Sequence, residues 1–208
     1  MSGTSLDGVD AMLAGFGSAR PEPLAHSYVA FPEPFKLQLG ELCVSGPDEF
    51  DRAGVAQQQL ARHYAQAVDQ LLARAQISSQ DVRAIGAHGQ TIRHRPEQGY
   101  TLQLNAPALL AELCGIDVVS DFRSRDIAAG GQGAPLAPVY HQALAGRLAK
   151  PVAVLNLGGV GNVTWIGEHE LIAFDTGPGN GLIDDWVRAR AGHPYDEDGR
   201  IAAAARID

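Results

Sequence analysis

The glycines of this chain constrain its fold more than any other residue type, because they gather in short clusters. The 208 residues include 24 glycines, with clusters at residues 3–8, 130–133, 158–161 and 177–181. Glycine is used where the backbone takes a positive φ or comes close to a ligand. The clusters adjoin the ends of predicted strands, which is where open α/β sheets bind their ligands. The pattern therefore indicates an α/β protein with several ligand-binding turns.

The spacing of apolar residues predicts the elements between these turns. Steps of three and four residues predict a long helix over residues 47–76 and shorter helices over 136–148 and 179–191. Short apolar or alternating runs predict strands over residues 9–14, 82–87, 116–120, 160–166 and 171–174, and a hairpin over 92–104. The nearly uninterrupted apolar run at 152–157 predicts a strand that is buried on both faces. Asn105 is the expected N-cap of a helix that ends near Gly115.

Composition narrows the class of protein. The 16 basic and 24 acidic residues give a formal charge of -8 and a pI near 5.3, whereas nucleic-acid-binding proteins usually carry a basic face. We therefore expect no nucleic-acid partner. No run approaches the roughly 20 apolar residues that a membrane span needs, and residues 1–5 lack the basic and apolar regions of a secretory signal. Cys43 and Cys114 are expected to be free thiols in a reducing cytoplasm.

The first glycine cluster is a candidate phosphate-binding turn. Its run consists of Gly3, Thr4, Ser5, Leu6, Asp7, Gly8, Val9 and Asp10. The glycines leave backbone N–H groups open to an anion, and Thr4 and Ser5 add hydroxyl donors. The carboxylates of Asp7 and Asp10 are candidates for orienting a hydrated metal ion on the phosphates. The run lacks the Gly-Lys-Ser/Thr ending of a P-loop, and a plain β-turn is the competing interpretation.

Two further motifs offer groups that recognise sugars or carboxylates. His88, Gln90 and Thr91 follow a predicted strand and present an imidazole, an amide and a hydroxyl, which suits a polyol. A loop histidine with ordinary hydrogen bonds is the alternative. Arg123 follows Asp121 and precedes the glycines at 130–133, and its guanidinium is a candidate partner for a substrate carboxylate. An Arg–Asp pair that only holds the loop is the competing interpretation.

The last two glycine clusters offer a second turn and a candidate base. Residues 156–162 predict another phosphate-binding turn, with a glycine hairpin as the alternative. Together with the opening turn it would close on a polyphosphate from either side. Asp175 ends a predicted strand and precedes a Gly-Pro-Gly turn into a helix N-terminus, which is itself a candidate anion site. The Asp175 carboxylate is a candidate general base for water or a hydroxyl group.

Taken in chain order, these motifs resemble those of the anhydro-N-acetylmuramic acid kinases. The resemblance rests on residues 2–10 (SGTSLDGVD), 87–91 (AHGQT), 121–123 (DFR), 130–136 (GGQGAPL), 156–159 (NLGG) and 174–180 (FDTGPGN). Each motif alone is weak, but their shared order along nearly the whole chain is specific to this family.

The resemblance implies a fold and a chemistry. The fold is α/β and actin/hexokinase-like (ribonuclease H-like), with two lobes around a cleft: here residues 1–127, followed by the beginning of an incomplete second lobe at 128–208. The activity is that of a cytoplasmic enzyme that uses ATP and Mg²⁺. It opens 1,6-anhydro-N-acetylmuramic acid with water and phosphorylates the freed 6-oxygen during cell-wall recycling. A homodimer is compatible with the family, and no membrane partner is implied.

The roles of the family's residues transfer to this sequence position by position. The opening run, Gly3 to Asp10, would bind the ATP phosphates, and Asp175 would activate the attacking water. The sugar would contact His88, Gln90, Thr91 and Arg123, and the metal ligands stay unassigned. An ordinary glycosidase would need a second carboxylate near Asp175. One base suffices if the departing oxygen attacks the γ-phosphate.

Members of this family are longer than the present chain. The front of the first strand and the adenosine-binding part of the second lobe are expected to be missing from it. We therefore expect the isolated 208-residue chain to have little or no kinase activity. The alternative function is a non-catalytic fragment that binds a sugar or a nucleotide. A third interpretation, a glycosidase, predicts hydrolysis of the sugar without ATP.

Overall fold

The computed structural model describes residues 1–3, 6–17 and 21–206. The chain divides into two units, Met1–Ala134 and Pro135–Asp208. This division lies a few residues beyond the boundary that the sequence predicts after residue 127. Helices and strands occur in both units, so the predicted α/β class is confirmed.

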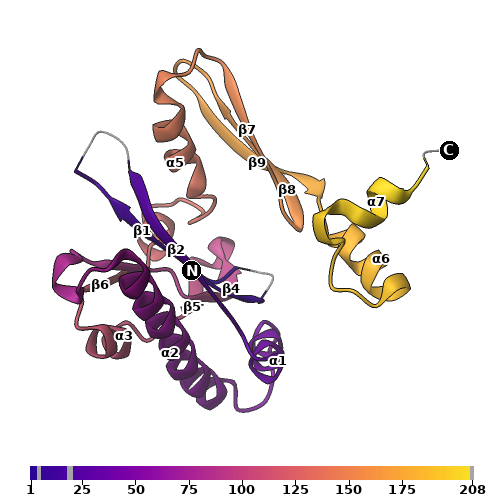
Figure 1. Ribbon diagram of the computed structural model, residues 1–208. Helices are drawn as coiled ribbons and strands as arrows, with labels where there is room; N and C mark the ends of the chain where they lie inside the picture. The colour runs from indigo at the N-terminus through magenta and orange to yellow at the C-terminus, as the bar shows by residue number, and fades with distance from the viewer. Residues whose placement is uncertain (4–5, 18–20, 207–208) are drawn as a thin grey trace. The chain divides into compact units, whose positions relative to one another are not determined.

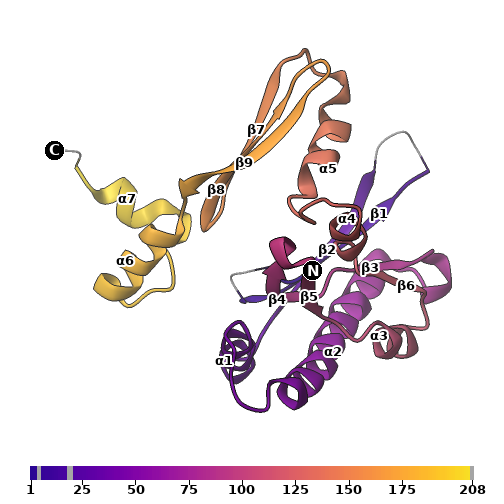
Figure 2. The same ribbon diagram turned by 180° about the vertical axis from the view of Figure 1, so that it is seen from behind.

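The first unit combines small sheets with one long helix (Figure 1). Its strands are β1 (Gly8–Gly15), β2 (Glu22–Ala30), β3 (Ile85–Ala87), β4 (Gln90–Arg95), β5 (Tyr100–Leu104) and β6 (Val118–Ser120). Its helices are α1 (Glu33–Leu42), α2 (Glu49–Ala75), α3 (Pro107–Cys114) and α4 (Ser124–Ala128), with short 3₁₀ turns at Ser79–Asp81 and Pro96–Gln98. β1 pairs antiparallel with β2, and β4 with β5. β3 pairs in parallel with β6, as seen from behind in Figure 2.

The long helix α2 organises the core of the first unit. It confirms the helix predicted over residues 47–76, and it packs against β1, β2 and α3. Leu60, Tyr64 and Leu71 share its buried face at spacings of one and two helical turns. Leu39 of α1 and Leu110 of α3 are completely buried in the same cluster. Burial of one such leucine stabilises the fold by about 1.5–3 kcal/mol, so this packing holds the strand ends that carry the candidate site.

The predicted cap of α3 is wrong. The N-cap position is occupied by Ala106, and the Asn105 side-chain amide donates to the Ala87 carbonyl oxygen at 2.8 Å. Asn105 therefore ties the start of α3 to the end of β3. The apolar pattern also predicts neither β2 nor α1. Prolines at 21, 23, 32 and 34 interrupt the pattern there, although Pro34 is tolerated in the first turn of α1.

The second unit contains an antiparallel sheet and its flanking helices. Its elements are α5 (Ala137–Leu144), β7 (Val152–Leu157), β8 (Val160–Ile166), β9 (Leu171–Pro178), α6 (Gly181–Ala191) and α7 (Arg200–Ala204), with 3₁₀ turns at Ala145–Arg147 and Glu197–Gly199. Figure 1 shows α5 alongside the sheet and α6 beyond the end of β9. His141 Nδ1 lies 2.9 Å from Thr164 Oγ1, a hydrogen bond that joins α5 to β8.

The prediction that residues 152–157 are buried on both faces is wrong. Within the described part of this unit, α5 covers one face of the sheet, so half-buried and exposed residues alternate at the start of β7. The strand register places a set of large apolar side chains on the other face. These side chains are 40–60% exposed: Leu155, Trp165, Ile172 and Phe174.

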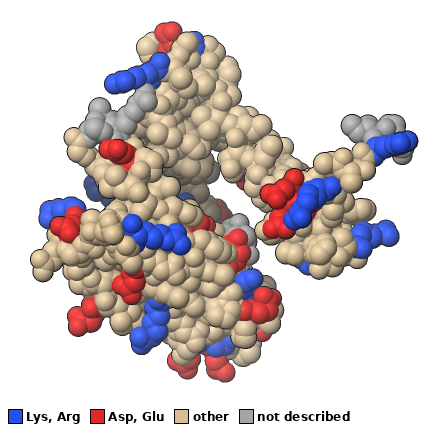
Figure 3. Space-filling model, in the orientation of Figure 1, with Lys and Arg blue, Asp and Glu red and all other residues tan. Residues whose placement is uncertain are grey.

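Charged side chains of both signs are visible on one face of the molecule (Figure 3). On the face drawn in Figure 3, acidic and basic side chains lie among each other rather than in separate fields. Of the helices within residues 1–3, 6–17 and 21–206, none combines the length and the apolar character that a membrane crossing requires.

Candidate active-site residues

Two of the predicted motifs meet beyond the parallel pair of β3 and β6. Ala87 at the end of β3 is the register partner of Ser120 at the end of β6. The residues that follow these strands therefore emerge side by side. His88 follows β3 and Arg123 follows β6, and the Arg123 Nε donates to His88 Nε2 at 2.8 Å.

This hydrogen bond determines which nitrogen of His88 carries the proton. A guanidinium group only donates, so Nε2 accepts, and the proton lies on Nδ1. Nδ1 donates to the Gly89 carbonyl oxygen at 2.8 Å. Burial lowers the pKa of His88, the bond to Gly89 opposes this effect, and the positive charge of Arg123 adds to it. A neutral imidazole with both nitrogens engaged orients Arg123 rather than transferring a proton.

Arg123 also holds the glycine cluster at 130–133. Its Nη1 donates to the Gly133 carbonyl oxygen at 2.6 Å, and the Gly133 N–H donates to Asp126 Oδ2 at 2.7 Å. Gly131 approaches the same aspartate so closely that an added Cβ would overlap the carboxylate. These contacts place Arg123 against a carbonyl oxygen of the loop. Its burial lowers the pKa of the guanidinium.

The other two predicted sugar contacts are the first two residues of β4. Gln90 is 1% exposed, and its side-chain oxygen has no hydrogen-bond partner among the residues that the structure describes. Thr91 is half-buried, and its hydroxyl accepts a hydrogen bond from Gln103 Nε2 at 3.3 Å. Of the predicted set, His88 and Arg123 are thus in direct contact, whereas Gln90 is enclosed by the first unit.

The opening run is described at Gly3 and from Leu6 onward. Thr4 and Ser5 lie outside the described residues. The Leu6 N–H donates to the Gly3 carbonyl oxygen at 3.2 Å, and Leu6 takes a φ of 53°. Asp7 follows at the surface. The described backbone groups of Gly3 and Leu6 are therefore hydrogen-bonded to each other ahead of β1.

The last residues of the opening run belong to β1 itself. Val9 is 1% exposed and forms part of the core. Gly8 permits close pairing with β2, because an added Cβ would lie 2.5 Å from the Val29 carbonyl oxygen. Asp10 Oδ1 lies 3.1 Å from His26 Nε2 in an exposed pair. Gly8 and Val9 thus fix the start of β1 in the core. Of the first three residues of β1, Asp10 has the polar side chain.

In the second unit, Asp175 lies within a row of polar side chains. β9 continues to Pro178, so Asp175 does not end the strand as predicted. It is exposed and is the register partner of Asn162 on β8, which in turn pairs with Asn156 on β7. Cβ atoms of directly opposed residues are about 4.5–5.5 Å apart, so a carboxylate and an amide lie side by side.

Sequence reasoning assigns both asparagines to a phosphate-binding turn. Their actual placement could have been inferred from their spacing. Asn156 and Asn162 are equidistant from Gly159, so a hairpin centred on Gly159 pairs them across β7 and β8.

The turn between β7 and β8 is held against the start of α6. The Gly179 N–H donates to the Gly159 carbonyl oxygen at 3.0 Å, and the Asn180 N–H donates to that of Gly158 at 2.6 Å. The Asn180 side-chain amide adds a bond to the Leu157 carbonyl oxygen at 2.9 Å. The N–H groups expected to bind an anion at this helix start are thus bonded to carbonyl oxygens.

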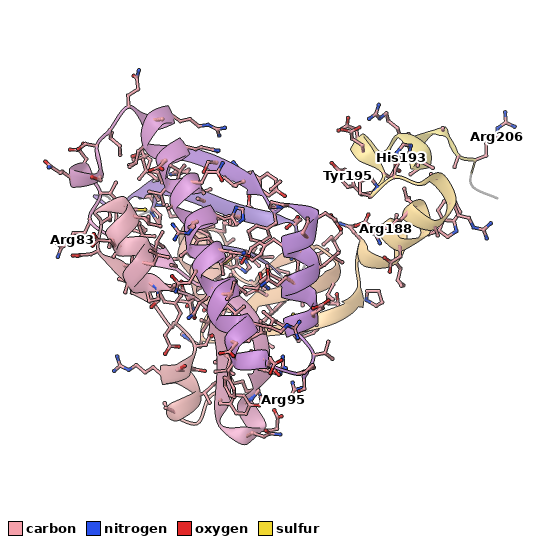
Figure 4. The ribbon with its side chains drawn as sticks, turned by 90° about the horizontal axis from the view of Figure 1, so that it is seen from below. Arg83, Arg95, Arg188, His193, Tyr195 and Arg206 are labelled. Atoms are coloured by element: carbon pink, nitrogen blue, oxygen red, sulfur yellow. The ribbon has the colours of Figure 1, made fainter. Side chains whose placement is uncertain are left out.

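Two surface hollows are lined by none of these residues. One, of about 440 Å³, is lined by Phe35 and His63 among others, between α1 and α2. The other, of about 580 Å³, is lined by residues that include His193 and Tyr195, which Figure 4 shows together with Arg188. Within the described parts of the chain, no three His, Cys, Asp or Glu side chains are grouped to hold a metal ion. The candidate site therefore rests on the hydrogen-bonded groups and not on these hollows.

The fold and its polar groups define a mixed α/β protein with a histidine–arginine pair at strand ends and a carboxylate beside an amide on a sheet. The family model for anhydro-N-acetylmuramic acid kinase matches residues 1–208. The chain belongs to this family, which confirms the resemblance found in its motifs.

Curated relatives agree with this assignment. The anhydro-N-acetylmuramic acid kinases of Bordetella pertussis, Cupriavidus pinatubonensis and Variovorax paradoxus are 56%, 52% and 50% identical to the chain. Each match covers 100% of this chain, and 55%, 57% and 58% of the respective relative. The chain thus spans little more than half the length of these relatives.

Proposed function

We propose that this chain provides the water-activating and phosphate-binding residues of an ATP-dependent kinase for 1,6-anhydro-N-acetylmuramic acid. The observation that carries the proposal is the family match over all 208 residues, with Asp175 exposed in β9 beside Asn162. The product would be N-acetylmuramic acid 6-phosphate, formed in cell-wall recycling.

In this reaction Asp175 would act as the general base. Water forms a bond to the anomeric carbon on the side opposite the bridge oxygen, and Asp175 takes its proton. The bond between the anomeric carbon and the 6-oxygen breaks, and this oxygen attacks the γ-phosphorus of ATP as ADP leaves. The phosphate thereby replaces a separate acid on the departing oxygen. Asn162, directly across the strand pair, would hold the carboxylate toward the water.

The sugar would be recognised in the first unit. Its lactyl carboxylate suits the Arg123 guanidinium, which neutral His88 orients through the hydrogen bond at Nε2. Thr91 would add a hydroxyl contact. Gln90 belongs to the same predicted set, but its side-chain oxygen is enclosed by the first unit, so the direct sugar contacts that we propose are those of Arg123 and Thr91.

ATP would bind with its phosphates at the opening turn, Gly3 to Asp7, with Gly8, Val9 and Asp10 anchoring it. A Mg²⁺ ion bound to nucleotide phosphates needs only one or two protein carboxylates. The exposed Asp7 and Asp10 fit that requirement. The ion would supply charge neutralisation on the phosphates.

The proposal also covers the fold family of the protein and its cellular compartment. We assign the chain to a two-lobe, actin/hexokinase-like kinase that acts in the cytoplasm, where ATP is available. The free thiols of Cys43 and Cys114 agree with a reducing compartment. We expect a homodimer, which light scattering on the full-length protein would test.

The test is a hybrid enzyme in which this chain replaces the matching part of the Bordetella pertussis relative. We expect the hybrid to form the 6-phosphate from the anhydro sugar only when ATP is present. Asp175→Asn should lower kcat by at least about a hundredfold, while the sugar still binds within about twofold. Asp185→Asn, which changes an exposed carboxylate on α6, is the matched control and should keep its activity.

The other functions predict different results in the same assay. Sugar hydrolysis without ATP would identify a glycosidase. A folded hybrid that binds both ligands without turnover would indicate a non-catalytic binding segment. Unchanged turnover in Asp175→Asn would remove this residue from the mechanism. For the isolated chain we expect little or no turnover.

A further inference from the structure

Asn105 holds the strand end from which His88 projects. Its side-chain amide donates to the Ala87 carbonyl oxygen at 2.8 Å. Ala87 is the last residue of β3 and is 2% exposed, and its register partner Ser120 ends β6. Asp121, the residue after Ser120, takes a φ of 56°, so the chain turns away from β3 there. The Asn105 amide thus supplies a donor to a carbonyl oxygen at the point where the strand pairing ends.

The loop that carries His88 is held at both ends by the end of β5. Gln90 pairs with Leu104, the last residue of β5, and Asn105 follows Leu104 directly. Gly89 takes a φ of 81°, and an added Cβ would overlap the Leu104 carbonyl oxygen and lie 3.1 Å from Asn105 Cβ. His88 and Gly89 are therefore two residues between fixed anchors, and one of these anchors is the Asn105 amide.

The orientation of His88 in turn determines that of Arg123. His88 Nδ1 donates to the Gly89 carbonyl oxygen at 2.8 Å, and His88 Nε2 accepts from Arg123 Nε at 2.8 Å. Arg123 Nη1 donates to the Gly133 carbonyl oxygen at 2.6 Å. Its Nη2 has no hydrogen-bond partner among the residues that the structure describes. Two contacts thus fix the plane of the guanidinium and leave one terminal nitrogen for a ligand.

We propose that Asn105 is a positioning residue: through the peptide that precedes His88, it holds Arg123 in the orientation that binds the sugar. This inference rests on the proposed function, because it takes Arg123 as the partner of the lactyl carboxylate. An amide suits the task, since it donates to the carbonyl oxygen and carries no charge that would compete with the guanidinium for the sugar. The structure gives the N-cap position of α3 to Ala106, which leaves the Asn105 side chain for this contact.

The first test compares two variants of the 208-residue chain by ¹⁵N NMR of the His88 ring, which needs no ligand. Asn105→Ala removes the amide, whereas Asn105→Asp keeps its volume and, as a carboxylate, donates no proton. The wild-type chain should show Nδ1 protonated and Nε2 unprotonated. In both variants we expect a mixture of tautomers, and the Arg123 Nε–H should exchange with water about fivefold faster, as loss of one hydrogen bond allows. If Asn105→Ala does not fold, Asn105→Asp carries the same test.

The second test is the binding of 1,6-anhydro-N-acetylmuramic acid, titrated into the same proteins. We expect its Kd to rise about fivefold in both variants, because the guanidinium loses its fixed orientation. A residue that acts only through His88 has no further effect once that ring is removed. Asn105→Ala should therefore change the Kd by less than about twofold when it is added to His88→Ala.

Asp81→Ala is the matched control for stability. The Asp81 carboxylate accepts hydrogen bonds from the Ser78 N–H and the Ser78 hydroxyl, both at 2.8 Å, in the 3₁₀ turn ahead of β3. Its removal weakens the same unit without changing a contact of the loop that carries His88. The His88 tautomer should stay as in the wild-type chain, and the Kd for the sugar should stay within about twofold.

The outcomes distinguish this inference from the proposed function. A wild-type His88 that is protonated at Nε2, or a His88 ring that is unchanged in both Asn105 variants, overturns the positioning role and leaves the proposed function standing. The same holds if Asn105→Ala raises the Kd equally with and without His88, or if Asp81→Ala has the same effect, since the cause is then a general loss of stability. A wild-type chain with the expected tautomer that does not bind the sugar contradicts the proposed function and, with it, the basis of this inference.

Discussion

Among single residues, Gly179 shows how the second unit uses a glycine. A Cβ at this position would overlap the Gly158 carbonyl oxygen, and one on Gly181 would lie 3.1 Å from the Gly159 carbonyl oxygen. The missing side chains let the start of α6 pack directly on the turn between β7 and β8. This packing follows β9 within a few residues of Asp175, so it holds the strand end that carries the candidate base.

Gly179→Ala should therefore destabilise the second unit. We expect a loss of about 1–3 kcal/mol, the usual range for atoms inserted where there is no space. Both tryptophans, Trp165 and Trp186, lie in this unit, so their fluorescence during urea unfolding reports on it. Gly146→Ala is the control, because an added Cβ there meets nothing within 4 Å. Equal unfolding midpoints for the two variants would contradict this account of Gly179.

The site residues differ in how far the sequence could predict them. His88 and Arg123 stand out by residue type at predicted strand ends, but their hydrogen bond depends on the pairing of β3 with β6, which no local pattern encodes. The placement of Asn162 beside Asp175 likewise depends on strand register. Tyr64 shares a buried helix face with leucines, so its spacing predicts a core residue, and only the structure shows that its hydroxyl lies 3.2 Å from Ser2 Oγ.

At the scale of elements, α1 and α2 meet through an aromatic stack. The rings of Phe35 and His63 lie 5.2 Å apart at an interplanar angle of 28°, and Phe31 contacts both rings edge-on. Burial lowers the pKa of His63 below its ordinary value of 6.5. The packing of the two helices therefore favours the neutral imidazole.

This packing predicts that the first unit loses stability in mild acid. Below pH 6.5 the unfolded chain binds a proton at His63 more readily than the folded chain, so stability falls as pH drops from about 6.5 towards the lowered pKa. His88, whose pKa is also lowered, contributes with the same sign. His63→Phe should show a smaller drop between pH 7.5 and 5.5, measured by helix circular dichroism in urea.

The control for this pH effect is His169→Phe, which alters an exposed histidine of the second unit and should keep the wild-type drop. An equal drop in His63→Phe and the wild-type chain would show that His63 does not carry the effect.

The sequence predicts best those elements whose apolar residues recur at one regular spacing. The helical spacing of α2 is regular over its whole length, and its predicted limits are within two residues of Glu49–Ala75. β2 and α1 are interrupted by prolines and are not predicted. The run at 152–157 shows that apolar composition does not determine burial, because burial depends on what covers each face of the sheet.

At the scale of the whole molecule, the described chain leaves one face of the β7–β9 sheet both apolar and exposed. Leu155, Trp165, Ile172 and Phe174 share this face, and contiguous exposed apolar surface usually marks a binding surface or a tendency to associate. The curated relatives are nearly twice as long as the chain.

The isolated chain should therefore bind the dye 8-anilinonaphthalene-1-sulfonate through the second unit. The double variant Ile172→Thr, Phe174→Thr removes apolar surface and places a β-branched residue at both positions of β9, so we expect weaker dye fluorescence with little change in secondary structure. Leu37→Ser removes an exposed leucine of α1 and should leave the dye signal nearly unchanged. Equal signals in all three proteins would show that this face does not bind the dye.

Isotope labelling of the hybrid enzyme tests the proposed mechanism most directly. In water enriched in ¹⁸O, with the product examined at early times by ¹³C NMR and mass spectrometry, we predict one heavy oxygen on the anomeric hydroxyl. The oxygen between carbon 6 and phosphorus should remain ¹⁶O, and Asp175→Asn should form no labelled product. Heavy oxygen in the phosphate group, or a product without label at the anomeric carbon, would contradict the assignment of Asp175 as the base that directs water to that carbon.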